Sequence, residues 1–134
     1  MAVTKSDSFQ IRCEADVVAV RQQARTWCHE CGFSLVEQTK MVTAASEIAR
    51  NTLIYGGGGA VDFFRLEEGA KKGLQLVFSD QGPGIANLDE ALRDGFTSGN
   101  GLGLGLGGAR RLVNEFQIWS QSGQGTRVTI TRWK

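Results

Sequence analysis

The sequence predicts an α+β fold, a two-layer α/β sandwich in which helices cover one face of a mixed, mostly antiparallel sheet. Two long helical patterns come early in the chain, and most of the strand-like stretches follow them. The connections after Glu67 and Gln121 are short enough for hairpins, which join antiparallel strands. A length of 134 residues without a linker or a repeat fits a single domain, residues 1–134.

The first half of the chain predicts one strand and two helices. The strand is expected around Phe9–Cys13, and the helix after it ends at Gly32. The inward positions of that helix are Val17, Val20, Ala24, Trp27 and Cys31. The second helix opens with the capping box Ser34–Glu37 and stops at Gly56. Its apolar pattern runs through Leu35, Val36, Val42, Ala45, Ile48, Ala49 and Leu53.

The second half predicts two hairpins separated by a lid and a short helix. Strands Val61–Leu66 and Leu74–Ser79 flank a polar turn over Glu67–Gly73. The lid is expected over Ala86–Asn100, with a helical turn or two from Asp89 to Leu92 and hinge-like residues over Gly95–Gly99. A helix over Ala109–Phe116 follows, and the terminal hairpin contains the strand Arg127–Thr131.

Six glycines occupy the ten positions from Gly99 to Gly108, directly before the short helix. Glycine is costly to order, so such a run indicates that a ligand or another backbone approaches this main chain closely. A glycine loop that opens a helix is typical of phosphate binding. It is not a dinucleotide fingerprint, which must follow a strand, nor a P-loop, which ends in Gly-Lys-Ser/Thr. A protein-kinase glycine loop lies near the start of its domain and is followed by a strand lysine.

Asp80 ends a predicted strand and is followed by Gln-Gly-Pro-Gly. A carboxylate at that point can accept a hydrogen bond from the amino group of adenine. Gly82 and Gly84 would then leave room for the base and the ribose. The alternative is an ordinary turn aspartate beside glycine and proline.

Glu47 and Asn51 lie four residues apart on the second predicted helix, so their side chains share one face. An amide oxygen suits Mg²⁺, which takes one or two protein ligands besides water and phosphates, and Asn51 fits that role. Glu47 can accept the proton of an attacking hydroxyl, as phosphoryl transfer requires. The alternative is a solvent-exposed polar face.

Together these motifs resemble the GHKL, or Bergerat-fold, ATP-binding family. Glu47-x-x-x-Asn51 matches the N box of that family, and Asp80-x-Gly82-x-Gly84 matches its first glycine box. The second glycine box corresponds to Gly101, Gly103 and Gly105, and the last motif runs from Gly123 to Thr126. The resemblance covers the chain from about Val17 onward and implies ATP and Mg²⁺ as cofactors.

Within that family the chain resembles the switch serine/threonine kinases of the RsbT type, through Gly32–Lys40, Ser46–Asn51, Asp94–Phe96 and Gly107–Leu112. Anti-sigma-factor kinases usually follow the N-box asparagine with alanine and histidine, whereas Thr52 follows it here. The resemblance implies transfer of the ATP γ-phosphate to a STAS-domain scaffold or antagonist in a partner-switching stress response. The released kinase would then activate a PP2C-type phosphatase or another output protein. The alternatives are an anti-sigma factor with kinase activity and a nucleotide-gated binding module without catalysis.

Positive charge at the γ-phosphate is expected from the helix after Gly108, with Arg110 or Arg111 as candidates. The alternative for both arginines is a solvent-facing helix surface. A net charge of +1 does not suggest nucleic acid as a partner. The amino end has no hydrophobic signal core and no apolar run approaches a membrane span, so we expect a cytoplasmic protein.

Three cysteines, an odd number, fit a reducing compartment better than a disulfide framework. Cys28 and Cys31 have the spacing of a metal or redox pair, but the chain offers no second ligand pair. Structural thiols in the first helix are the favoured interpretation. His29, the only histidine, is expected on the surface.

Overall fold

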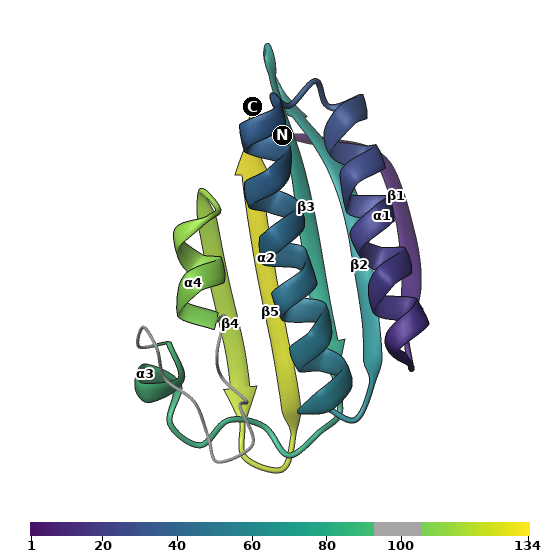
Figure 1. The fold of residues 1–134 in the computed structure, drawn as a ribbon. Coiled ribbons are helices and arrows are strands. Elements are labelled where there is room, and N and C mark those ends of the chain that lie inside the picture. The colour runs from purple at the N-terminus through teal and green to yellow at the C-terminus, as the bar shows by residue number, and fades with distance from the viewer. Residues whose placement is uncertain (93–105) are drawn as a thin grey trace.

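The computed structural model describes residues 1–92 and 106–134. Its elements follow in the order β1 (Ala2–Ile11), α1 (Glu14–Glu30), α2 (Leu35–Ile54), β2 (Gly59–Glu68), β3 (Lys71–Asp80), α3 (Leu88–Ala91), α4 (Leu106–Arg111), β4 (Glu115–Gln121) and β5 (Gly125–Trp133). The five strands form one sheet in the order β1-β2-β3-β5-β4 (Figure 1). The α+β sandwich is confirmed. Every pairing among the described strands is antiparallel, so the expected mixed character of the sheet is wrong.

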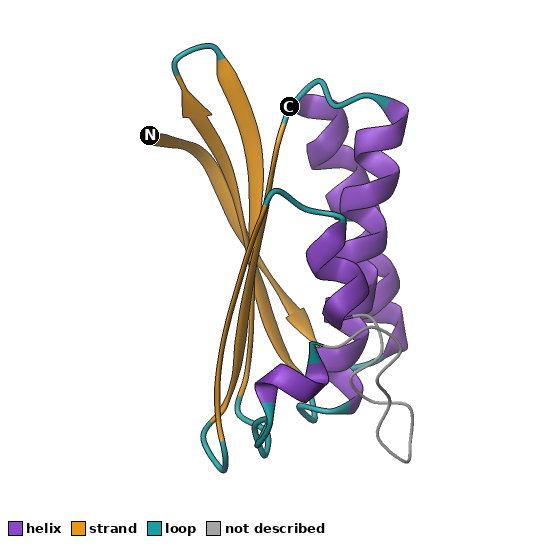
Figure 2. Ribbon diagram, turned by 90° about the vertical axis from the view of Figure 1, so that its left-hand side faces the viewer, coloured by secondary structure: helices purple, strands orange, loops and turns teal. Residues whose placement is uncertain are grey.

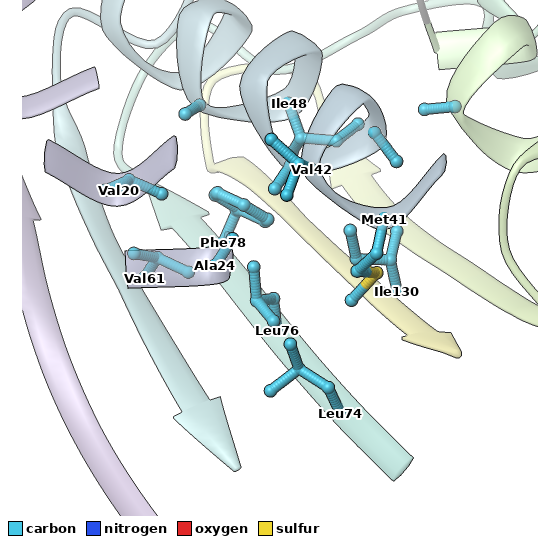
Figure 3. Packing of buried hydrophobic residues seen from close by; sticks show 14 of the residues in the cluster. Val20, Ala24, Met41, Val42, Ile48, Val61, Leu74, Leu76, Phe78 and Ile130 are labelled. Atoms are coloured by element: carbon cyan, nitrogen blue, oxygen red, sulfur yellow. The ribbon is translucent and has the colours of Figure 1, made fainter. Parts of the chain in front are cut away.

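The described helices all lie on one face of the twisted sheet (Figure 2). Side chains from α1 and α2 point toward alternate side chains of the central strands and form the core (Figure 3). Trp27 and Phe9 each pack edge-on against Phe63, with ring centroids 5.3 and 5.1 Å away. Edge-to-face geometry is favoured because a positive ring edge meets a negative ring face. The core therefore joins α1 to the β1–β2 half of the sheet.

The first strand is much longer than expected, Ala2–Ile11 in place of Phe9–Cys13. Its residues before Phe9 are mostly exposed and carry no clear apolar alternation, so the pattern gave no signal there. Pairing with β2 extends from Ala2 opposite Glu67 to Ile11 opposite Gly59, with a shift of register between Val3 and Lys5, and this pairing defines the strand. Cys13 is instead the residue that precedes α1.

The capping box of α2 is confirmed, because Ser34 Oγ accepts from the Glu37 N–H at 3.1 Å and Glu37 Oε1 accepts from the Ser34 N–H at 2.8 Å. Two residues of the apolar pattern, Leu35 and Val36, do not join the core, since they are 73% and 63% exposed. At about 100° per residue, Val36 points about 180° away from Ala45 on the buried face, whereas Leu35 is the first residue of the helix.

The β2–β3 turn is tighter than the expected Glu67–Gly73. The strands continue until Glu68 faces Lys71, which leaves Gly69 and Ala70 as a two-residue turn. Glu67 faces Lys72 one step earlier, so opposite charges sit across from each other on both pairs. Gly69 has φ of 62°, the left-handed conformation that such turns require.

The helix expected over Ala109–Phe116 is also wrong in its bounds. α4 spans Leu106–Arg111, and β4 begins at Glu115. Phe116 and Ile118 alternate with exposed residues and pack against the core, opposite Ile130 and Val128 of β5. This segment is therefore a strand and not a helix, because alternation with a period of two lets strand pairing partly bury these two side chains.

The helical turn of the expected lid is α3, Leu88–Ala91, one residue earlier than predicted. The rest of that segment, including Gly95–Gly99 and the glycines Gly101, Gly103 and Gly105, lies outside the described residues. In the ranges 1–92 and 106–134 we find no helix with the length and apolar character needed to cross a membrane.

We expect Ser34→Ala to lower the free energy of unfolding by about 1 kcal/mol, because the Glu37 N–H loses its acceptor at the start of α2. Urea denaturation followed by circular dichroism measures the change. Thr43→Ala, an exposed substitution inside the same helix, is the matched control and should cost less than about 0.5 kcal/mol. Equal losses in the two variants would contradict the capping role.

Candidate functional site

One end of the sandwich brings together the end of α2, the end of β3 and the start of β5 (Figure 1). Asp80 is the last residue of β3, and Thr126 faces it in β5. Gly56, just beyond α2, packs so closely that a Cβ atom there would lie 2.4 Å from the Asp80 carboxyl carbon. Only glycine fits such an approach. The sequence marked Gly56 merely as a helix stop, so its role beside the carboxylate was missed.

The Asp80 carboxyl group is held by main-chain donors at the strand end. The Gly82 N–H donates to Asp80 Oδ1 at 2.9 Å. Burial raises the pKa of Asp80, while hydrogen bonds from the backbone of Gly82 and Thr126 act to lower it. The side chain is only partly exposed, and the hydrogen bond from Gly82 helps to hold its orientation. A carboxylate can accept more hydrogen bonds than these, so Asp80 can also accept from a donor on a ligand.

Gly82 and Gly84 are both required by contacts within the chain. A Cβ atom on Gly82 would lie 2.7 Å from Gly56 Cα, and one on Gly84 would lie 2.1 Å from the carbonyl oxygen of Gln121. Gly84 also has φ of 75°, which disfavours other residues. Close packing of backbone on backbone thus accounts for both glycines. That they also leave room for base and ribose stays a prediction.

Ser120 of β4 ties the loop after Asp80 to the last hairpin. Its Oγ accepts from the Ile85 N–H at 2.7 Å, donates to the Gly125 carbonyl at 3.0 Å and lies 2.7 Å from Thr126 Oγ1. The Gly123 N–H also donates to the Pro83 carbonyl at 2.6 Å. Sequence reasoning singled out Thr126 and missed Ser120. The only signal was a polar residue at a half-buried position of a strand, which is too common to be specific.

Glu47 and Asn51 both lie on α2, as expected, with Glu47 exposed and Asn51 half-buried. The Asn51 carbonyl accepts from the N–H of Gly56 at 3.1 Å. The backbone of Asn51 is thus hydrogen-bonded to the glycine that packs on the Asp80 side chain. Glu47 lies eight residues before the C-cap Tyr55, roughly 12 Å along the helix axis. The two side chains therefore extend the site away from Asp80 along one face of α2.

The side-chain amide of Asn51 indicates whether a nucleotide and a metal ion fit this site. Among residues 1–92 and 106–134, its buried Nδ2 atom has no hydrogen-bond partner. Buried polar atoms are almost always bonded, so this amide is suited to a polar ligand. An amide offers a donor for a phosphate oxygen and an oxygen that a hard cation accepts. The residues present thus fit ATP with Mg²⁺.

The helix expected to supply positive charge begins earlier than predicted. Gly107 and Gly108 lie inside α4, whose first residue is Leu106, so no helix starts after Gly108. Arg110 and Arg111 occupy its last turn and are exposed. α4 contacts α2, which places this short helix on the same side of the sheet as Glu47 and Asn51. Whether either arginine reaches a phosphate stays a prediction.

Both cysteines of the Cys-x-x-Cys spacing are in the core. Cys28 and Cys31 are buried free thiols, whereas Cys13 is exposed. Burial raises the pKa of Cys28 to about 12 and also raises that of Cys31, so neither thiol ionises near neutral pH. His29 is exposed, as expected. The described part of the chain holds no group of three His, Cys, Asp or Glu side chains that could bind a metal ion.

The family model for the histidine kinase-like ATPase domain matches residues 9–132. The chain belongs to the histidine kinase-like ATPase family. The serine/threonine-protein kinase RsbT of Bacillus subtilis is 41% identical over 124 residues, which cover 92% of this chain and 93% of that protein. An anti-sigma F factor of Clostridium kluyveri is 30% identical over 103 residues, 74% of this chain and 72% of that protein.

These relationships place the chain among the ATP-dependent serine/threonine kinases of this ATPase family and confirm the resemblance to the RsbT type. The fold is shared with about a third of a chain in the structure of the RsbU and RsbW domains of a Mycobacterium tuberculosis protein, at a TM-score of 0.62 and 20% identity, over 96% of this chain and 32% of that one. It is also shared with a chain in the structure of the SiaB–SiaC complex of Pseudomonas aeruginosa, at a TM-score of 0.57 and 12% identity, over 98% of this chain and 91% of that one.

We expect a thiol reagent at pH 8 to modify one cysteine rapidly in the folded protein, because only Cys13 is exposed. All three should react in denaturant. Absorbance of the released chromophore counts the modified thiols. Cys13→Ser is the matched variant and should leave no rapidly reacting thiol. Rapid modification of two or three cysteines in the native state would contradict the buried positions of Cys28 and Cys31.

The raised pKa of Asp80 makes the stability of the folded protein depend on pH. Because the folded state holds this proton more tightly than the unfolded state, Asp80 lowers stability as the pH rises above about 4. Asp80→Asn lacks this effect. The melting temperature of Asp80→Asn relative to the parent protein should therefore increase from about pH 3 to about pH 7. Calorimetry across that range tests the sign, and a decreasing difference would contradict burial as the dominant cause.

Proposed function

We propose that this single domain, residues 1–134, transfers the γ-phosphate of ATP·Mg²⁺ to a serine or threonine of a STAS-domain scaffold or antagonist protein. After release from that protein, it activates a PP2C-type phosphatase or a similar output protein. The observation that carries the proposal is the oriented Asp80 carboxylate at the end of β3, joined through Gly56 to the helix that bears Glu47 and Asn51.

The proposed roles begin with Asp80 at the end of β3 and continue with the side chains of α2. Asp80 accepts the adenine amino group, with Gly82, Gly84 and Thr126 around it. Asn51, whose amide nitrogen is buried without a partner among the described residues, binds the Mg²⁺–phosphate group. Magnesium neutralises charge on the phosphates when it is bound. Gly101, Gly103 and Gly105 offer main-chain N–H groups to those phosphates, as glycine-rich loops do.

Glu47 acts as the base in this proposal. Its exposed position suits a group that must reach the hydroxyl of a second protein. It takes the hydroxyl proton as the oxygen attacks the γ-phosphorus, and the bond to the bridging oxygen of ADP breaks. Phosphoryl transfer needs little beyond positioning and charge neutralisation, so few residues suffice.

The partner assignment rests on the relatives. The 41% identical protein is named as a serine/threonine kinase, and a solved neighbour is a complex of two proteins. These names support a kinase that acts on another protein and exchanges partners. The anti-sigma F factors at about 30% identity support the alternative, an anti-sigma factor with kinase activity. The three free cysteines support a reducing compartment, so we propose the cytoplasm.

The decisive experiment compares two variants in binding and in transfer. Glu47→Gln should bind ATP within about twofold of the parent protein but lose phosphoryl transfer by about 10²-fold or more, because only the base is removed. Asp80→Asn should weaken ATP binding by about tenfold or more, because an amide in place of the carboxylate weakens the contact with the adenine amino group. Calorimetry with a non-hydrolysable ATP analogue measures binding, and labelled ATP with a STAS-domain protein measures transfer.

Glu68→Gln, an exposed change in the β2–β3 hairpin far from this end of the sheet, is the matched control and should leave both quantities unchanged. Unchanged ATP affinity in Asp80→Asn would overturn the adenine assignment. ATP binding without transfer to the STAS-domain protein, in the parent as in Glu47→Gln, would favour the anti-sigma kinase or the non-catalytic binding module.

A further inference from the structure

We propose that Ser120 sets nucleotide selectivity by fixing the direction of the hydroxyl proton on Thr126, so that Thr126 meets the base as a hydrogen-bond acceptor. Ser120 is a positioning residue in this proposal, since it acts through Thr126. The inference rests on the proposed function, because it assumes that a purine nucleotide binds beside Asp80.

Ser120 Oγ has one proton and two lone pairs. It receives the Ile85 N–H at 2.7 Å, which occupies one lone pair. It lies 3.0 Å from the Gly125 carbonyl, a contact that requires the Ser120 proton. The remaining contact is with Thr126 Oγ1 at 2.7 Å.

All three contacts are satisfied in one arrangement only. Because the Ser120 proton goes to Gly125, the hydroxyl of Thr126 must donate to the second lone pair of Ser120. Leaving a partly buried polar group unpaired costs free energy, which favours this full set of bonds. Thr126 then has no proton left for a ligand and presents only its lone pairs.

This assignment gives the site two acceptors side by side. Thr126 faces Asp80 across the β3–β5 ladder, and the Asp80 carboxylate is itself an acceptor held by backbone N–H groups. Two acceptors match the amino group at position 6 of adenine, which carries two protons. They oppose the carbonyl oxygen at the same position of hypoxanthine or guanine, which is an acceptor as well. The network therefore discriminates against 6-oxopurines.

The same hydroxyl also positions the loop that follows Asp80. Ser120 holds Ile85, at the end of that loop, and the carbonyl of Pro83 accepts from Gly123 in the β4–β5 turn. Gly84 between them packs on Gln121. A loss of Ser120 thus releases one anchor of the loop as well as the proton of Thr126. The test must separate these two effects.

The test compares ATP with ITP, which carries an oxygen in place of the 6-amino group. Calorimetric titration with Mg²⁺ gives the ratio of the two dissociation constants in each variant. We expect the parent to prefer ATP, and Ser120→Ala to lower that preference about fivefold or more, since the Thr126 hydroxyl becomes free to donate to the ITP oxygen. Ser120→Thr keeps the hydroxyl and should keep the parent ratio. Loosening of the loop alone would weaken both nucleotides alike and leave the ratio unchanged.

Thr126→Val keeps the test decisive if Ser120→Ala fails to fold. It removes the acceptor, so its ATP affinity should fall about fivefold while its ITP affinity changes little. An unchanged ratio in folded Ser120→Ala, or unchanged ATP affinity in Thr126→Val, overturns the inference and leaves the proposed function standing. A parent protein that binds ATP without preference over ITP also overturns it. A parent that binds neither nucleotide overturns the proposed function itself.

Discussion

The close approach of glycine backbone to Asp80 is the constraint on which the site depends. Gly56 packs on the carboxyl group, Gly82 packs on Gly56, and a Cβ atom on Gly125 would lie 2.2 Å from the Asp80 carbonyl oxygen. None of these contacts leaves room for a side chain. The segments around Gly56, Asp80 and Gly125, which are far apart in the chain, therefore meet at Asp80, and close backbone packing holds them there.

The helix α2 couples this site to the core. Its buried residues pack on the central strands, and its ordered start is secured by the capping box at Ser34. The same helix carries Glu47 and Asn51 on another face and ends against Asp80 through Gly56. Because a packed helix is rigid, the spacing between Glu47, the proposed base, and Asp80, the proposed adenine acceptor, is set largely by the rise of the helix. The free energy that folds the domain thus also positions the functional groups.

Much of the fold was predictable because its signals are local. The capping box, the glycine after α2 and the acid–amide pair at four-residue spacing all depend on neighbours within one or two turns. Element bounds were less predictable where pairing decided them. β1 extends back to Ala2 because β2 offers a partner, and Phe116 joins β4 because Ile130 lies opposite. Local pattern could not show either partner.

By itself, the sequence determined the order of elements, the family motifs and the candidate residues Glu47, Asn51 and Asp80, since each is encoded by residue type and short spacing. Only the tertiary structure decided what surrounds them. Ser120 meets Ile85 across 35 residues of sequence, and Asp80 meets Gly56 and Gly125 through sheet and helix packing. Such contacts arise from the register of β3, β4 and β5, and register is a property of paired strands that no single segment carries.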